Sequence, residues 1–172
     1  MLFRSTAGQV SQRSKFAITM YYLKPMTAFL RIGWKLYAHK QSPFNAAMSY
    51  ALANAITGTY PDFGINPSKV LVSRGALATA INATANDTGG NIELMWDDNS
   101  GTSSAKATDK TLVVILNETK GEIITDTSGA ERVESVQNIA MPANWSGDDL
   151  HVYLGFVSED GREVANSVYF SV

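Results

Sequence analysis

The spacing of hydrophobic positions divides the chain into two parts. In the first part apolar residues recur every three or four positions, as in amphipathic helices. This spacing predicts three helices, within residues 9–23, 25–40 and 43–57. Ser42 followed by Pro43 is a start signal for the third helix, because serine caps free N–H groups of a first turn and proline needs no N–H there.

In the second part apolar and polar residues alternate, which is typical of strands with one buried face. The candidate strands are residues 69–73, 91–96, 111–117, 122–126, 133–141, 150–158 and 163–172. Glycine-containing turns separate most of them. We therefore expect an α+β chain in which about three helices precede a seven-stranded antiparallel β-sandwich of immunoglobulin or fibronectin III type. Trp96 and the lack of cysteines favour the fibronectin-like pattern.

The two parts also differ in charge. Up to Lys69 there are eight lysines and arginines against one acid, Asp62, whereas from Val70 onward six basic residues face fifteen acids. Two prolines and a glycine in residues 59–69 mark the change. The predicted division is a basic helical region at 1–66 and an acidic immunoglobulin-like domain at 67–172. Opposite charges give the two surfaces different binding preferences.

Several classes of protein are disfavoured by composition. The absence of cysteine excludes disulfides, thiolate metal sites and cysteine nucleophiles. The apolar stretch at 16–38 is interrupted by Lys24, Pro25, Arg31 and Lys35, so it does not resemble a membrane span. The start of the chain shows no secretory signal. The default expectation is therefore a cytoplasmic protein without a transmembrane helix.

The stretch WDDNSGTSSAKATD at 96–109 is the strongest candidate for a metal site. Asp97, Asp98 and Asp109 could hold calcium between sandwich loops. However, the stretch fails the EF-hand pattern, because positions 5 and 12 of such a loop would be Gly101 and Thr108. A solvated loop after Trp96 is the favoured interpretation.

Catalytic signals are sparse. His39 and His151 lack neighbours at metal-ligand spacing, and no phosphate loop or nucleophile elbow is present. The sequence therefore predicts a protein that is not an enzyme and has no cofactor, and it gives no evidence of a small-molecule ligand.

The basic helices are the main functional candidate. Lys24, Arg31, Trp34, Lys35 and Tyr37 combine positive charge with aromatic rings. We expect them to form a docking surface for a protein partner or for self-association, in a structural or protein-interaction module with an envelope or phage setting as working hypothesis. The alternative is nucleic-acid binding, which the same residue types support.

Several long blocks resemble an uncharacterised family of bacterial proteins, common in Bacteroidetes and known only as a domain of unknown function. The blocks are QRSKFAITMYYLKPM (12–26), FNAAMSYALANAITGTYPDFGINPSKVLVSRGAL (44–77), MWDDNSG (95–101), ATDK (107–110) and NWSGDDLHVYLGFVSEDGREVANSVY (144–169). The resemblance covers nearly the whole chain. It implies that a glycine-rich N-terminal segment of the family is lacking here, and it implies no activity or site residue.

Overall fold

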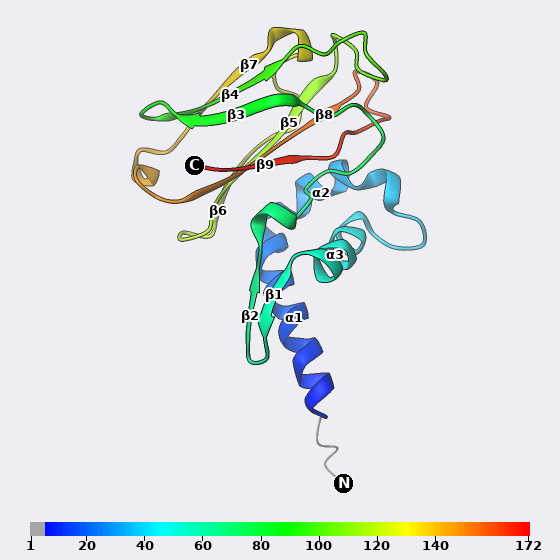
Figure 1. Cartoon of the computed structure of the whole chain (residues 1–172), viewed down its shortest axis with the longest axis vertical. Coiled ribbons are helices and arrows are strands. Elements are labelled where there is room, and N and C mark those ends of the chain that lie inside the picture. The colour runs from blue at the N-terminus through cyan, green and yellow to red at the C-terminus, as the bar shows by residue number, and fades with distance from the viewer. Residues whose placement is uncertain (1–5) are drawn as a thin grey trace.

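The computed structural model describes residues 6–172, as three α-helices and nine strands (Figure 1). The helices are α1 (Ala7–Leu23), α2 (Thr27–Gly33) and α3 (Pro43–Asn54). The strands are β1 (Ile56–Thr59), β2 (Asp62–Ile65), β3 (Ile81–Asp87), β4 (Asn91–Asp97), β5 (Lys110–Asn117), β6 (Glu122–Asp126), β7 (Val136–Ala140), β8 (Leu150–Val157) and β9 (Val168–Ser171). Short 3₁₀ turns flank α2, at Lys24–Met26 and Lys35–Tyr37.

Seven strands form two facing antiparallel sheets, with strand orders β3-β4-β7 and β6-β5-β8-β9. Inward side chains from both sheets share one apolar cluster, which includes Ile92, Leu94, Val113, Ile115, Leu154 and Phe156. Trp96 of β4 meets Phe156 of β8 edge-on, with ring centroids 5.6 Å apart. The expected antiparallel sandwich after an N-terminal helical part is therefore present, and Trp96 is buried within it.

A second apolar cluster lies on the other face of the four-stranded sheet, where the helices pack. Leu112, Val114 and Leu116 of β5 contribute to it from the sheet. Tyr22, Leu23, Met26, Phe29, Leu30, Trp34, Ala47, Met48 and Ala51 contribute from the helical part. Because successive side chains of a strand point to opposite faces, β5 supplies alternate residues to two cores. The helical part and the sandwich are thus joined by a continuous buried surface.

The N-terminal part differs from the expected all-helical region. Residues 56–65 form the β1–β2 hairpin, which runs beside α1 and away from the sandwich in Figure 1. The prolines and glycines that mark the predicted boundary form turns within and after this hairpin. The second helix is also shorter than expected, since regular α-helix ends at Gly33 and Leu36 is 39% exposed.

The predicted strands differ from the structure in four places, one of which is that the strand predicted at 163–172 begins only at Val168. Residues 69–73 form no strand; Val72 and Ser73 are buried, but the Val72 N–H donates to the Ser167 hydroxyl at 3.0 Å instead of to a strand partner. Strand β3 was not predicted, because its inward residues are small alanines. The predicted strand at 133–141 begins only at Val136, after a 3₁₀ turn at Arg132–Glu134.

The start of the third helix is confirmed: Ser42 is the N-cap, and its hydroxyl accepts a hydrogen bond from the Asn45 N–H at 3.1 Å. None of the helices in residues 6–172 combines the length and apolar character needed to cross a bilayer.

Candidate functional site

An arginine stacked among three aromatic rings is the most distinctive polar feature of the helical part. The Arg74 guanidinium carbon lies 5.7 Å from the ring centroid of Trp34, 4.5 Å from that of Tyr37 and 5.2 Å from that of Tyr50. These separations are within the range of cation–π attraction. The rings also contact one another, with Trp34 5.9 Å from Tyr37 and 5.5 Å from Tyr50.

Backbone contacts fix the segment that carries Arg74. The Arg74 N–H donates to the Gly33 carbonyl at 2.9 Å, and the Trp34 indole N–H donates to the Leu71 carbonyl at 3.0 Å. Gly33 permits this close approach, since a Cβ there would overlap the Val72 carbonyl oxygen. The segment leading from the helical part into the sandwich is therefore held against the end of α2, with Arg74 over the rings.

The Arg74 side chain has hydrogen-bonding capacity left over. Within residues 6–172 no hydrogen bond or ion pair reaches its guanidinium, which is only half-buried. A guanidinium carries five N–H donors in a fixed fork that suits a carboxylate or phosphate. The rings orient this fork without using its donors.

The guanidinium faces an open groove of about 490 Å³. Its lining comes from the 3₁₀ turn at Lys35–Tyr37, from α3 and from the connecting segments: Trp34, Tyr37, Gln41, Ala46, Ser49, Tyr50, Ala53, Asn54 and Arg74. Arg74 is the only charged residue in this lining, and the chain has no acid before Asp62. Because the lining carries one positive charge and no negative charge, an anionic group is favoured in the groove.

The five residues predicted to form the docking surface are distributed unevenly. Lys24, Arg31 and Lys35 are exposed, and Tyr37 is 38% exposed. Trp34 was expected at the surface but is 1% exposed, because its indole fills the core beneath Arg74. The groove brings together only Trp34 and Tyr37 of this set. The Lys35 ammonium lies instead toward Gly161 of the sandwich.

Sequence reasoning did not identify Arg74 or Tyr50 as site residues. Arg74 follows a buried segment that was predicted to be a strand, and no local pattern links it to rings 24 to 40 positions earlier. Tyr50 lies on α3 beside the expected apolar stripe, so an aromatic residue outside that stripe was the available signal in the sequence.

A second polar network joins the helical part to the sandwich. His151 of β8 contacts the Tyr169 hydroxyl through Nδ1 and the Glu118 carboxylate through Nε2, each at 2.9 Å. Both ring nitrogens are therefore occupied, which leaves none for a substrate proton. Next to it, the hydroxyls of Tyr22 and Tyr153 lie 2.7 Å apart, and burial raises the pKa of both phenols above the ordinary value. This network is suited to holding two layers together.

The three aspartates considered for calcium have separate partners. Asp97 accepts from the Asn82 amide at 2.7 Å, and Asp98 accepts from the Ser100 N–H at 2.9 Å. Hydrogen bonds from Ser100 lower the pKa of Asp98. Asp109 is fully buried beside Arg132. In the described part of the chain, no group of three histidine, cysteine or acidic side chains is arranged to hold a metal ion.

Comparison with solved structures gives a similarity to the fn3 domain of the human collagen alpha-1(XX) chain, with a TM-score of 0.42 and 7% identity. The similarity covers 56% of this chain and 84% of that one. A comparison with curated proteins finds no match. A family model described as DUF6266, a family of unknown function, matches residues 3–171. The chain therefore belongs to the DUF6266 family.

Proposed function

We propose that this protein is a non-enzymatic protein-interaction module that binds an acidic segment of a partner protein, with a carboxylate of that segment held by Arg74. The observation that carries the proposal is the Arg74 guanidinium itself, which three rings orient over a groove while its N–H donors bind no group within residues 6–172. A preoriented fork loses little conformational entropy when it pairs with a carboxylate. Bidentate pairing also makes such a contact directional.

The exposed cations of the helical part would steer the partner toward this groove. Lys24, Arg31 and Lys35 are solvent-exposed and have no acidic residue among positions 6–61 to neutralise them. Long-range attraction of this kind raises association rates and falls with ionic strength. We therefore assign steering to these three residues and the short-range contact to Arg74 and Tyr37.

A protein partner is favoured over nucleic acid by how the rings are used. Single-stranded nucleic acids bind through open aromatic faces that stack with bases, along a positively charged track. Here Arg74 already covers the cluster of Trp34, Tyr37 and Tyr50, and the groove contains a single cation. Nucleic-acid binding through Lys24, Arg31 and Lys35 is an outcome that the same experiment detects.

The test is fluorescence anisotropy with a labelled glutamate-rich peptide and, in parallel, a labelled single-stranded DNA of matched length. We expect saturable peptide binding that weakens with salt, and a loss of about tenfold or more in Arg74→Gln, the size of one charge-assisted pair. Arg74→Lys should restore little of it, because an ammonium lacks the fork. Lys69→Gln, which removes an exposed charge outside the groove, is the matched control.

Equal peptide binding by the native chain and Arg74→Gln would refute the proposed groove. Tighter binding of DNA, lost in a Lys24, Arg31 and Lys35 triple variant, would assign the surface to nucleic acid. The acidic segment could belong to a second copy of this chain or to a different protein. The solution mass of the unlabelled chain, measured over the same salt series, distinguishes these two cases. A mass that rises at low salt assigns it to the acidic sandwich of a second copy, and a constant monomer assigns it to another protein.

A further inference from the structure

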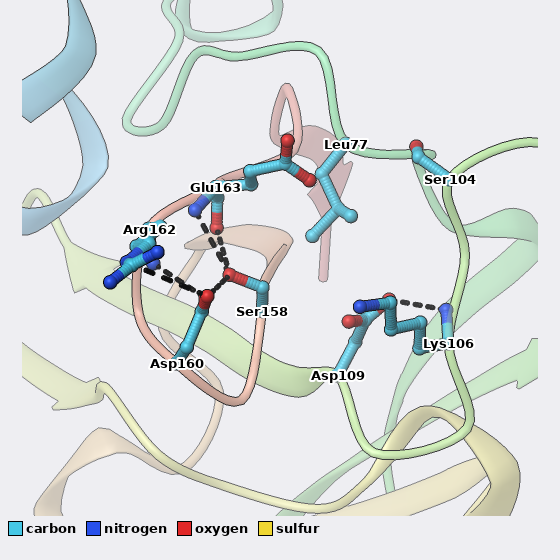
Figure 2. A pocket seen from close by; sticks show the side chains of 8 residues that line it. All are labelled: Leu77, Ser104, Lys106, Asp109, Ser158, Asp160, Arg162 and Glu163. Atoms are coloured by element: carbon cyan, nitrogen blue, oxygen red, sulfur yellow. Dashed lines mark hydrogen bonds and ion pairs between the residues drawn. The ribbon is translucent and has the colours of Figure 1, made fainter.

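A pocket of about 270 Å³ opens in the sandwich, apart from the Arg74 groove (Figure 2). Its lining combines the segment before β3, the loop before β5 and the turn after β8: Leu77, Ser104, Lys106, Asp109, Ser158, Asp160, Arg162 and Glu163. Leu77, Asp109 and Ser158 are buried, whereas the charged residues Lys106, Asp160, Arg162 and Glu163 are exposed. The pocket therefore has a buried floor and a charged rim.

The floor contains a carboxylate oxygen with unused hydrogen-bonding capacity. Asp109 is 0% exposed, and its Oδ2 accepts from the Lys106 N–H at 2.8 Å and from Arg132 Nε at 3.1 Å. Its Oδ1 is buried and accepts no hydrogen bond from residues 6–172. A buried acceptor left without a donor is costly, so such atoms are rare in folded proteins. A hydrogen bond from an N–H or O–H donor in the pocket would satisfy this oxygen.

Part of the rim is preorganised by its own hydrogen bonds. The Ser158 hydroxyl donates to Asp160 Oδ1 at 2.7 Å and accepts from the Glu163 N–H at 2.9 Å. Asp160 also accepts from the Arg162 N–H at 3.0 Å. The turn of residues 158–163 is therefore fixed, and Asp160 and Ser158 are already engaged.

Two charged groups of the rim remain available. Within the described chain, neither the Glu163 carboxylate nor the Lys106 ammonium takes part in a hydrogen bond or ion pair. Figure 2 shows the Lys106 side chain lying along Asp109, with Glu163 on the far side of the pocket near Leu77. The groups without a hydrogen bond are thus the acceptors Asp109 Oδ1 and Glu163 and the Lys106 ammonium, whose positive charge also acts on Asp160.

We propose that this pocket binds a small zwitterion of the α-amino acid class. Its ammonium would donate to Asp109 Oδ1 and its carboxylate would accept from Lys106, while the Glu163 carboxylate on the far side of the pocket would attract the ammonium over a longer distance. A ligand with both charges matches a pocket that offers both. The volume is below the usual range for drug-sized ligands, about 300–1,000 Å³, which suits a molecule this small.

Other ligand classes fit less well. A metal ion would need a denser set of ligands than the described residues provide. A simple anion would meet the buried Asp109 carboxylate, and a sugar would find Leu77 but no aromatic ring in the lining on which to stack. Neither would engage the free charges of Lys106 and Glu163 together.

The test is isothermal titration calorimetry of the full chain with L-alanine and L-serine. We expect saturable binding that is lost with N-acetyl-L-alanine, which lacks the ammonium, and with L-alaninamide, which lacks the carboxylate. Lys106→Gln should weaken binding about tenfold or more, as expected for a charge-assisted hydrogen bond, and Glu163→Gln should weaken it by a smaller factor, because Glu163 attracts the ammonium only from the far side of the pocket. Glu159→Gln and Lys69→Gln, at exposed residues outside the lining, are the matched controls.

A second readout avoids replacing Asp109, whose loss would disturb the buried ion pair. Carbon-13 NMR of the side-chain carboxyl groups should show the Asp109 signal moving as L-alanine is added. No saturable binding in the millimolar range, an unmoved Asp109 signal, or equal binding of N-acetyl-L-alanine or D-glucose would each overturn the proposal. In those cases an ordered water is the sufficient donor to Oδ1.

Discussion

At the scale of single residues, the buried pair of Arg132 and Asp109 is the feature with the largest expected energetic consequence. Both side chains are 0% exposed and lie 3.1 Å apart. Arg132 also donates to the Asn99 side chain and the Ala78 carbonyl, both at 2.8 Å. Its guanidinium carbon lies 3.8 Å from the Phe156 ring centroid. Burial lowers the pKa of Arg132, while Asp109 opposes that shift.

Replacing Arg132 by methionine should therefore destabilise the fold strongly. The substitution leaves the Asp109 carboxylate buried without its counter-charge, which typically costs about 3–5 kcal/mol in free energy of unfolding. Urea denaturation followed by tryptophan fluorescence measures this loss. Arg132→Met combined with Asp109→Asn should lose less than the sum of the two single variants, because both remove the same interaction. Additive losses would show that the two charges do not stabilise each other.

At the scale of elements, β5 and β8 explain why the helices and the sandwich form one structure. Every residue of Thr111–Asn117 is buried, and β8 is buried from Val152 onward. Strands buried on both faces have continuous apolar runs in place of alternation. The run TLVVIL in β5 is such a signal, and it indicates a layer on each face before any coordinates are known.

Tyr22 and Tyr153 form the polar link between α1 and β8. The Tyr153 hydroxyl donates to the Pro67 carbonyl at 2.9 Å, so the proton between the two phenols belongs to Tyr22. Burial raises the pKa of each phenol because the charged form would lose hydration. The neutral forms are therefore favoured by the fold.

The stabilising contribution of the hydrogen-bonded Tyr22 and Tyr153 hydroxyls should be lost at alkaline pH. A raised pKa in the folded state means that the contribution to stability is complete below the unfolded value of about 10 and is lost as pH rises above it. The free energy of unfolding should fall by about 1.4 kcal/mol per pH unit for each buried tyrosine. Urea titrations between about pH 9 and pH 11 should give a shallower slope for Tyr22→Phe than for the native chain. Lysines titrate alike in both proteins, so identical slopes would contradict the prediction.

At the scale of the whole molecule, the second apolar cluster crosses the charge boundary seen in the sequence. Leu112, Val114, Leu116 and Tyr153 of the sheet pack with the helices in that cluster. The face of the four-stranded sheet would be a large apolar patch without the helical part, and such patches promote association. The opposite charges of the two halves therefore describe their outer surfaces, while their buried surfaces are both apolar.

Residues 67–172 alone should consequently be poorly soluble or self-associating, even though they contain all seven strands of the two facing sheets. We expect the isolated segment to bind a hydrophobic dye such as ANS and to sediment as oligomers, and we expect the intact chain to unfold in one cooperative transition. Analytical ultracentrifugation and thermal unfolding followed by circular dichroism provide the measurements. A monomeric, dye-free segment with a sharp transition of its own would contradict this expectation.

Much of the element pattern was predictable because it depends on local chemistry. The N-cap of α3, the alternation of β4 and β8 and the glycine turns depend on neighbouring residues, whereas the end of α3 at Asn54 comes earlier than the predicted limit of residue 57. Strand β3 and the hairpin at 56–65 were not predicted, because alanines and prolines weaken the alternation of apolar and polar residues that indicates a strand. The unpaired segment at 69–73 was mistaken for a strand because Val70 and Val72 alternate as strand residues do.

The sequence by itself determined that helices precede an antiparallel sandwich, the charge of each half and the lack of thiol chemistry, since each depends on residue type and short-range spacing. Only the tertiary structure decided which side chains meet. Arg74 reaches rings 24 to 40 positions away, and Asp109 pairs with an arginine 23 positions later, through strand pairing and packing that no local pattern records. Trp34 shows the same limit, because burial depends on what the rest of the chain places over a residue.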